Sequence, residues 1–302
     1  MTEFAVEVEN LSKSYKNIQA VDTISFSIQD GELFGLIGPD GAGKTTTMRI
    51  LCGLLSFDKG QCKVLNFDVI TQFKQIKKII GYMPQRFSLY PDLTVSENLR
   101  FFADLFQVTP VGREKRLDRL LQFSKLEPFQ KRRADRLSGG MKQKLALSCT
   151  LIHTPRLLIL DEPTTGVDPI SRREFWEILH ELKQEGVTIL VSTPYMDEAN
   201  QCDRVAMMHR GKILAIDSPE NISNLFSDHL LEIITDELIN TSTQLKELTE
   251  IKSLQIFGDK IHVTTENVDH VIKIIRDNFP GVRSIQKIEP GIEDTFIELM
   301  QR

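Results

Sequence analysis

A glycine-rich segment, residues 38–45, limits the possible folds of this chain more than any other feature. It reads GPDGAGKT, follows the continuous apolar run 33–37 and leads into a helical pattern. A strand, then G-x-x-x-x-G-K-[ST], then a helix is the context that identifies a phosphate-binding loop. The glycines let backbone N–H groups turn toward phosphates, and the helix presents its positive N-terminal end to the same anion. We therefore expect Lys44 to reach the β- and γ-phosphates of a nucleotide and the Thr45 hydroxyl to bind Mg²⁺.

The apolar pattern around this loop predicts an α/β core. Continuous apolar runs are typical of strands that are buried on both faces of a parallel sheet. Runs that alternate apolar and polar residues are typical of half-buried strands. A helical pattern at 171–185 places its apolar residues on one face, and Asp30-Gly31 is a turn signal. Strands that alternate with helices indicate a largely parallel sheet. The expected strands are residues 4–9, 24–28, 33–37, 157–160, 187–192, 205–209 and 212–216.

Two regions depart from this alternation. Residues 86–136 are mostly helical with prolines as breakers, which indicates a helical insertion over about 86–137. The tail has the order strand, helix, hairpin, helix, strand, helix, which resembles a small ferredoxin-like α+β sandwich. Its expected pieces are 230–235, 243–248, strands on either side of Gly258-Asp259, 268–279 and 284–289. The fold class is therefore α/β, a P-loop NTPase core with an antiparallel β subdomain and a helical insertion at 1–227, followed by a small α+β domain at 228–302.

Charge and composition exclude several classes of protein. The 302 residues carry a net charge of −5, and residues 228–302 hold 8 Lys and Arg against 14 Asp and Glu. An acidic tail on a near-neutral body argues against nucleic acid as a partner, which would need a basic face. The basic stretch 113–136 leaves two alternatives, a solvated helical surface or an area facing anionic lipid or an acidic partner.

The chain shows no feature of a membrane span, a secretion signal or a disulfide framework. Its longest uncharged stretches have 11 residues, whereas a spanning helix needs about 18 or more apolar residues. The acidic N-terminus lacks the apolar core of a signal peptide. Four scattered cysteines form no C-x-x-C pair, so we expect reduced thiols in a cytosolic protein.

Two carboxylates follow the buried run 157–160. Asp161 is placed to hold the hydration shell of Mg²⁺, and Glu162 to orient or deprotonate an attacking water. A third signal, Ser138-Gly139-Gly140 before a helical pattern, forms a second anion-binding arrangement. One nucleotide does not need two such sites in one chain. The economical interpretation is that the second site completes the pocket of a neighbouring subunit.

Together these motifs resemble the ATP-binding subunit of an ABC transporter over about residues 4–220. Residues 38–46 match its Walker A motif, with Asp40 where the family usually has Asn. Residues 138–143 match the LSGGQ signature, with Met141 in place of its first glutamine. The nucleotide contacts that this resemblance implies are Tyr15, which would stack on adenine, Gly38, Pro39, Asp40, Gly41, Ala42, Gly43, Lys44, Thr45, Thr46, Ser138, Gly139, Gly140 and the D-loop residue Asp168.

The resemblance also implies a set of catalytic and metal residues. Glu162 would be the catalytic base, with Gln85 as the Q-loop glutamine and Lys44 as the Walker A lysine. Mg²⁺ would be held by Thr45, Gln85 and Asp161. The cofactors implied are ATP and Mg²⁺. The partners implied are transmembrane permease subunits and a second ATP-binding subunit, in a homodimer or a heterodimer, at the cytoplasmic, inner face of the cell membrane.

One position departs from the family pattern. Ser192-Thr193 is followed by Pro194 where the family has a histidine that donates a hydrogen bond to the γ-phosphate. Proline has no side-chain donor, so we expect slow hydrolysis. The YMDEA segment at 195–199 and the acidic tail resemble exporter-type ATPases of the drug- and polysaccharide-efflux group. Two alternatives remain: a weakly or non-hydrolysing regulatory subunit, and a soluble ABC ATPase not tied to transport.

Overall fold

The computed structural model describes residues 4–86 and 89–301, which divide into two compact units. The first unit ends at Pro219 and the second begins at Glu220. The division therefore falls eight residues before the boundary expected from the sequence, since residues 220–227 belong to the second compact unit. Their contacts explain this, because the Ser227 hydroxyl donates to Glu298 near the end of the chain.

A six-stranded sheet forms the centre of the first unit. Its strands in spatial order are β10 (Lys212–Asp217), β9 (Arg204–His209), β3 (Leu33–Ile37), β8 (Thr188–Thr193), β7 (Leu157–Asp161) and β6 (Ile80–Met83). All neighbours are parallel except β10, which is antiparallel to β9. Every residue of β3, β7 and β8 is buried, as their continuous apolar runs predict.

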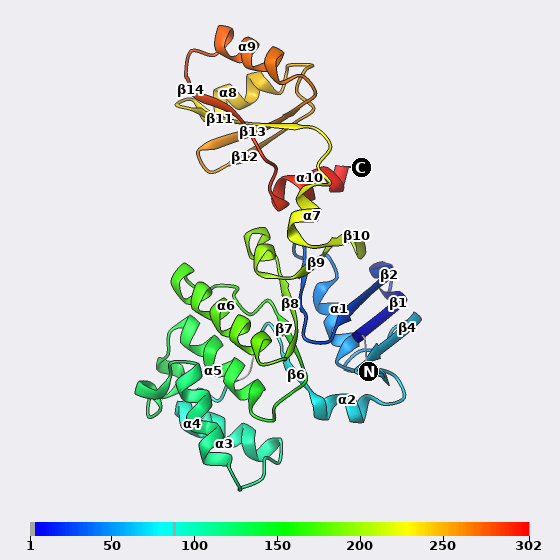
Figure 1. Ribbon diagram of the computed structural model, residues 1–302, viewed down its shortest axis with the longest axis vertical. Coiled ribbons are helices and arrows are strands. Elements are labelled where there is room, and N and C mark those ends of the chain that lie inside the picture. The colour runs from blue at the N-terminus through cyan, green and yellow to red at the C-terminus, as the bar shows by residue number, and fades with distance from the viewer. Residues whose placement is uncertain (1–3, 87–88, 302) are drawn as a thin grey trace. The chain divides into compact units, whose positions relative to one another are not determined.

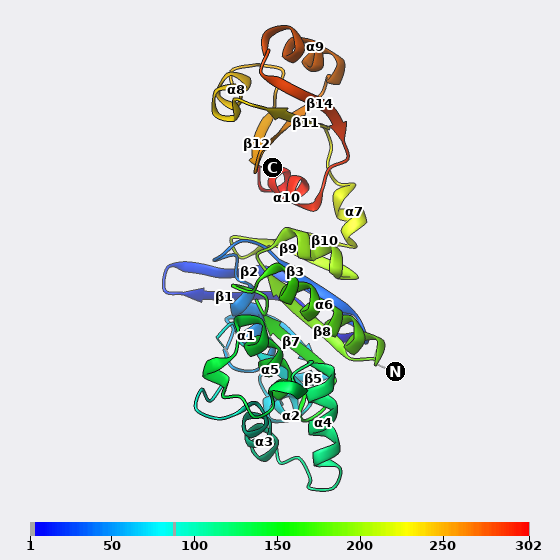
Figure 2. The ribbon, with the colours of Figure 1, turned by 90° about the vertical axis from the view of Figure 1, so that its left-hand side faces the viewer.

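Helices cover both faces of this sheet (Figures 1 and 2). Helix α1 (Lys44–Leu51) lies on one face and contacts β7. Helices α5 (Gly139–Leu151) and α6 (Pro169–Gln184) lie on the other face, where α5 packs against α6 and β6. The helical pattern expected at 171–185 is confirmed as α6, whose buried face includes Phe175, Ile178 and Leu182.

A second, antiparallel sheet packs against the other side of α1. Its strands in spatial order are β2 (Ile18–Gln29), β1 (Phe4–Tyr15), β4 (Lys59–Val64) and β5 (Phe67–Asp68). Helix α1 contacts both β2 and β4, so it lies between the two sheets. The apolar side chains of both sheets and α1 form one core, which includes Ile28, Phe34 and Met48.

The described part of the insertion, residues 89–137, is mostly helical, as expected from the sequence. It contains α3 (Val95–Leu105), α4 (Arg113–Phe123) and two short 3₁₀ turns, η1 (Glu127–Phe129) and η2 (Ala134–Arg136). Thr94 caps α3 with a capping box, in which the Glu97 N–H donates to the Thr94 hydroxyl and the Thr94 N–H donates to the Glu97 carboxylate. Within the basic stretch, Arg113 pairs with Asp104, and Arg133 pairs with Asp92 and Asp135.

The strand pattern of the sequence omitted several elements of the first unit. These are β4, β5, β6 and α2 (Phe73–Ile79), and β1 and β2 are longer than the runs 4–9 and 24–28. The strand β4 has only two buried residues, Cys62 and Val64, so its apolar signal is short. In β1, register shifts between Val8 and Ser14 interrupt the alternation that marks a strand.

The second unit has one four-stranded antiparallel sheet and helices. Its strands in spatial order are β12 (Ser253–Phe257), β13 (Lys260–Thr265), β11 (His229–Thr235) and β14 (Val282–Ile288). Its helices are α7 (Pro219–Ser223), α8 (Leu238–Leu245), α9 (Val268–Asn278) and α10 (Ile292–Gln301). The helix expected at 243–248 was misplaced, because α8 buries Thr241 and Ser242 beside Leu245 and so lacks an apolar stripe.

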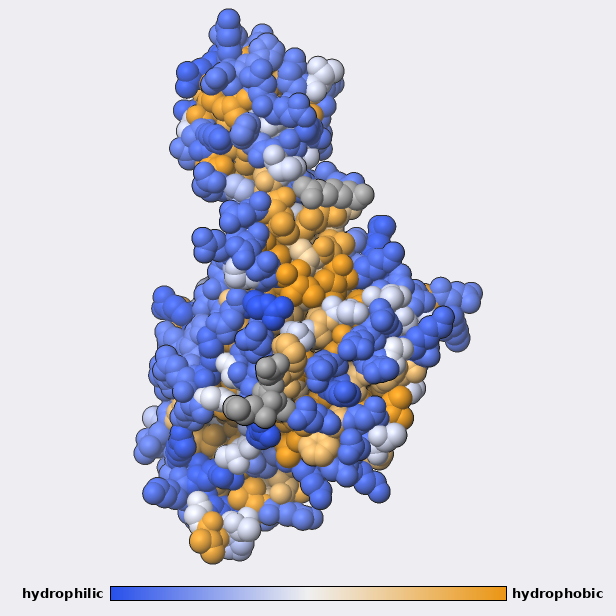
Figure 3. Space-filling view, turned by 45° about the vertical axis from the view of Figure 1, so that its right-hand side comes forward, coloured by the Kyte–Doolittle hydropathy of each residue, from blue (hydrophilic) through white to orange (hydrophobic). Residues whose placement is uncertain are grey.

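In the part of the chain that the structure describes, no helix is both long enough and apolar enough to cross a membrane. Hydrophilic residues cover most of the face shown in Figure 3. All four cysteines are free and buried, and burial raises the pKa of Cys62 to about 12.

Candidate functional site

The loop at 38–43 joins the end of β3 to α1 through tight backbone approaches. A Cβ at Gly38 would lie 2.1 Å from the Met208 carbonyl oxygen, so only glycine fits there. Gly43 has φ +108°, and its Cβ would lie 2.3 Å from the Ala20 carbonyl oxygen. No side chain caps α1, which leaves the backbone N–H groups of its first turn directed at the loop. The geometry suits a phosphate at the helix N-terminus.

Lys44 points back along the loop and meets the Glu162 carboxylate. Its Nζ donates to the carbonyl oxygens of Gly38 at 2.6 Å and Pro39 at 3.0 Å, and lies 3.1 Å from Glu162 Oε1. Both side chains are buried, at 3% and 6% exposed. Gln85 Nε2 donates to the other Glu162 oxygen at 2.9 Å. The structure thus brings together the three residues that the sequence predicted to be catalytic.

Glu162 itself has a strained backbone. Its φ is +51°, in the left-handed region that costs a non-glycine residue roughly 1–2 kcal/mol. Its N–H donates to the carbonyl and the hydroxyl oxygens of Ser192, at 3.2 and 3.1 Å. Strain of this kind is concentrated at functional sites, where surrounding contacts hold it.

Asp161 is the buried carboxylate beside this pair. Its Oδ1 accepts hydrogen bonds from the hydroxyls of Thr45 and Ser192, each at 2.9 Å. Its Oδ2 is buried and has no hydrogen-bond partner among the described residues. A buried oxygen acceptor without a partner, next to a threonine hydroxyl, fits the oxygen ligands that Mg²⁺ takes. The residues present therefore suit the predicted metal.

A pocket of about 460 Å³ opens between the loop and the antiparallel sheet. Tyr15, 43% exposed, lies at this pocket, where a stacking base would need an accessible ring. Of the predicted residues, the pocket is lined by Tyr15, Gly41, Ala42, Gly43, Lys44, Thr45, Thr46 and Glu162. Its other lining residues, which the sequence analysis missed, are Ile18, Gln19, Ala20 and Arg210. They belong to β2 and the β9–β10 turn, which no local motif connects to the phosphate loop.

The signature residues lie outside this pocket. Ser138 is the N-cap of α5 and accepts a hydrogen bond from the Met141 N–H at 3.3 Å. A Cβ at Gly140 would lie 2.4 Å from the Ser171 side chain. Asp168 is exposed and caps α6 by accepting the Ser171 N–H at 2.9 Å, which lowers the Asp168 pKa. Neither Ser138 nor Asp168 lines the pocket at Lys44, as expected if they serve a second subunit.

The turn at Pro194 follows β8, next to the phosphate loop. The Thr193 carbonyl accepts the Gly38 N–H at 3.3 Å, so the turn begins at the first residue of the loop. Ser192 is a further residue that the site uses and the sequence analysis did not select. Like Asp161, Ser192 is a polar residue that follows an apolar run, and this position was the signal that could have identified it as a site residue.

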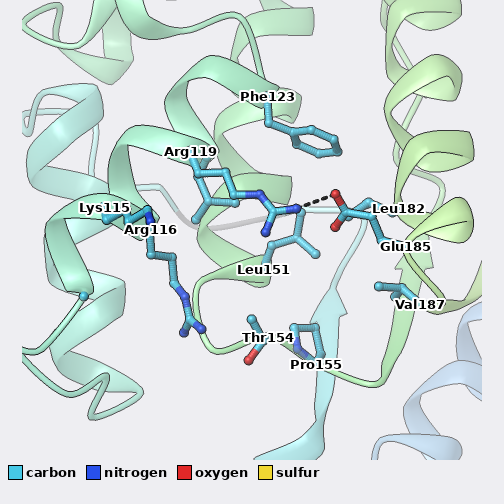
Figure 4. A pocket seen from close by; sticks show the side chains of 12 residues that line it. Lys115, Arg116, Arg119, Phe123, Leu151, Thr154, Pro155, Leu182, Glu185 and Val187 are labelled. Carbon is cyan, nitrogen blue, oxygen red and sulfur yellow. Dashed lines mark hydrogen bonds and ion pairs between the residues drawn. The ribbon is translucent and has the colours of Figure 1, made fainter.

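A separate pocket lies between α4, the residues after α5 and the C-terminal end of α6 (Figure 4). Lys115 and Arg116 lie on one side of it, and Arg119 forms an ion pair with Glu185 across it. It shares no lining residue with the pocket at Lys44 and contains no predicted site residue.

The parallel sheet, the glycine loop and the carboxylates after β7 define a P-loop nucleotide-binding protein. The comparisons identify its family. The ABC transporter family model matches residues 21–165. The chain is 34% identical to the Nod factor export ATP-binding protein I of Rhizobium etli, over 99% of this chain and 94% of that protein. It therefore belongs to the ATP-binding proteins of ABC transporters.

Two further relatives refine this comparison. The chain is 40% identical over 311 residues to the probable multidrug ABC transporter ATP-binding protein YbhF of Escherichia coli K12. This match covers 99% of the chain and 53% of YbhF, so the chain spans about half the length of that relative. The ATP-binding cassette MJ0796, solved as a dimer bound to ADP and Pi, superposes with a TM-score of 0.64 at 26% identity, covering 70% of this chain and 98% of that one.

The two glycines with positive φ in the loop give a matched pair of variants. Gly41 and Gly43 both have positive φ, but only Gly43 faces a backbone atom where a Cβ would go. We expect Gly41→Ala to lower the free energy of unfolding by roughly 1–2 kcal/mol, the cost of the left-handed conformation. Gly43→Ala should cost more, because the Ala20 carbonyl must also move. Urea denaturation without nucleotide measures both, and equal losses would contradict the predicted clash.

Proposed function

We propose that this chain binds and hydrolyses Mg-ATP to drive a separate membrane permease, as an exporter ATPase. The observation that carries the proposal is the contact of Glu162 with both Lys44 and Gln85 at the end of a phosphate loop. A carboxylate that can accept a proton from water, beside a lysine that can meet phosphate charge, suits phosphoryl transfer to water.

In the proposed reaction, a water oxygen bonds to the γ-phosphorus of ATP while the bond to the β,γ-bridging oxygen breaks. Glu162 accepts a proton from the attacking water, and Gln85 orients that water. Lys44 stabilises the charge on the β- and γ-phosphates. Thr45, Asp161 and Gln85 are the residues that would hold Mg²⁺, which when bound supplies positive charge to the phosphate oxygens. Catalysis is then mostly positioning and charge stabilisation.

We propose a head-to-tail dimer in which each ATP lies between Lys44 of one subunit and Ser138 of the other. Two observations support it. Ser138 and Asp168 lie outside the pocket of their own chain, and Ser138 is the N-cap of α5, where an anion is favoured. The related cassette MJ0796 was solved as a dimer with ADP and Pi.

The transport role rests on the relatives. Their names describe multidrug transport and Nod factor export, so export is the proposed direction. The permease would be a separate chain, docked near Gln85 and the helical insertion, which places this protein at the cytoplasmic face of the membrane. The second unit is proposed to be ferredoxin-like and regulatory. The sheet order β12-β13-β11-β14 and the alternation of its strands with α8 and α9 support this fold.

The alternative of a weakly hydrolysing regulatory subunit is favoured by one position, Pro194, which cannot donate to a γ-phosphate. The buried contacts of Glu162 favour the hydrolytic reading.

The first test separates nucleotide binding from hydrolysis. We expect Glu162→Gln to bind Mg-ATP and to lose about 10²–10⁴-fold in turnover, because the amide cannot accept the proton. Lys44→Ala should instead lose nucleotide binding. Glu185→Gln, an exposed carboxylate outside the site, is the control. Nucleotide affinity and phosphate release are the measurements, and wild-type turnover in Glu162→Gln would contradict its role as base.

Dimerisation should depend on ATP and on the signature loop. A two-fold symmetric interface uses each surface twice, so one substitution damages both sites. In a Glu162→Gln background, Ser138→Arg should abolish the dimer that Mg-ATP induces, because it adds bulk and charge against the partner's nucleotide. Gln122→Arg, exposed on α4, should not. Light scattering decides, and a full-strength dimer with Ser138→Arg would contradict the arrangement.

Restoring a donor at position 194 should speed hydrolysis. Loss of one preorganised donor typically costs about 10²–10³-fold in rate, which sets the upper bound of the gain in Pro194→His. Pro194→Ala, which removes the ring and adds no donor, separates the donor from the backbone constraint of proline. Turnover should rise in Pro194→His more than ATP affinity changes. Equal rates in wild type and Pro194→His would show that another group supplies the hydrogen bond.

A further inference from the structure

A buried carboxylate close to the proposed site has no part in the chemistry described so far. Glu198, in the 3₁₀ turn η3 (Met196–Gln201), is 3% exposed. Its Oε2 accepts hydrogen bonds from the hydroxyls of Thr193 at 2.5 Å and Thr164 at 3.1 Å. Its Oε1 lies 3.5 Å from Arg172 Nε, an ion-pair contact in which neither atom makes a hydrogen bond among the described residues.

The three partners of Glu198 come from three segments around the proposed reaction centre. Thr164 lies two residues after Glu162, and Thr193 ends β8 and precedes Pro194. Arg172 lies near the start of α6, the helix that Asp168 caps. Because their hydroxyls donate to a single oxygen atom, Thr164 and Thr193 are held in a fixed relation by Glu198.

Thr193 extends this connection to the phosphate loop. Its carbonyl accepts the Gly38 N–H at 3.3 Å, and its hydroxyl accepts the Tyr195 N–H at 3.1 Å. The turn that contains Pro194 is therefore fixed by Glu198 from one side and by the first residue of the loop from the other. Arg172 also lies 4.1 Å from the Tyr195 ring, so the turn packs against α6 as well.

The Glu198 carboxylate is costly to remove, because its buried partners depend on it. A buried ionised carboxylate is tolerated only when it is paired and hydrogen-bonded. Removing it leaves the two hydroxyls without their acceptor and the Arg172 guanidinium without a buried counter-charge, and each of these losses is penalised. We expect these groups to regain partners by movement of the partly exposed turn at Pro194 and of the segment after Glu162, which reaches the surface at Thr165 and Gly166.

We propose that Glu198 is a positioning residue for ATP hydrolysis, which holds the Pro194 turn and the segment after Glu162 in register with the phosphate loop. The inference rests on the proposed ATPase function and gives a role to a residue of the YMDEA segment that the sequence analysis did not place at the site. A histidine at position 194 could be ordered by its own hydrogen bond to phosphate. Proline has no such bond, so here the turn depends on the contacts of Thr193 with Glu198 and Gly38.

Substitutions at position 198 test the proposal in the full-length chain. Glu198→Ala should lower kcat at least tenfold while ATP affinity changes less than threefold, at a temperature where the variant is fully folded. Glu198→Gln should keep kcat within threefold, because its amide oxygen can still accept both hydroxyls. Asp197→Ala is the matched control, since Asp197 is the neighbouring residue, is 75% exposed and also lies near Arg172, at 3.7 Å. Its kcat should stay within twofold.

Thr193 provides a second test that does not depend on the folding of a position-198 variant. Thr193→Val keeps the shape of the side chain and removes the hydroxyl, so it should lower kcat. Thr193→Ser keeps the hydroxyl, so its kcat should stay close to that of the wild type. In a double-mutant cycle, Glu198→Ala and Thr193→Val should be strongly non-additive in kcat. A kcat in Glu198→Ala within twofold of wild type, an equal loss in Asp197→Ala, or additive effects would overturn the proposal. A wild-type chain without ATP turnover would contradict the proposed function and this inference together.

Discussion

The buried ion pair between Lys44 and Glu162 is the contact on which the rest of the site depends. It joins the phosphate loop to the end of β7, two segments more than one hundred residues apart in the sequence. Burial of two charges is favourable only when further hydrogen bonds satisfy them. Here the carbonyls of Gly38 and Pro39 accept from the lysine, and Gln85 donates to the carboxylate. Removing one partner of such a pair typically costs about 3–5 kcal/mol.

The parallel sheet explains why these groups meet. β3, β8 and β7 are parallel neighbours, so their carboxyl ends lie at one edge of the sheet. Ile37 pairs with Thr193, and Asp161 pairs with Ser192, which sets the loop, the Pro194 turn and the two carboxylates side by side. The antiparallel sheet then adds Tyr15 as a further wall of the pocket. Each group of lining residues comes from a different element, and the hydrogen-bond register of the strands fixes how far along the sheet each group lies.

Prediction from the sequence succeeded where a pattern has a direct physical cause. Strands buried on both faces must be continuously apolar, so β3, β7 and β8 were found within one or two residues. It failed for β4, which is mostly exposed, and for α8, whose buried face carries Thr241 and Ser242. In both elements, the packing of neighbouring elements decides which residues are buried, and the apolar pattern of the local sequence does not predict that set. The two compact units divide after Pro219, eight residues before the boundary expected after residue 227, and the intervening segment contacts α10 through Ser227.

The sequence by itself determined the chemical groups of the site, because G-x-x-x-x-G-K-T and the paired carboxylates have few other uses. It named Lys44, Thr45, Asp161 and Glu162, and the structure places them together. Only the tertiary structure decided how they are connected. The sequence analysis named the segments that contain Ser192 and Glu198 but gave neither residue a place in the site. In the structure Ser192 bonds both carboxylate residues, and Glu198 joins Thr164 to Thr193. Their roles come from distances across the sheet edge, which depend on strand register and on the packing of α6, and a linear pattern contains neither.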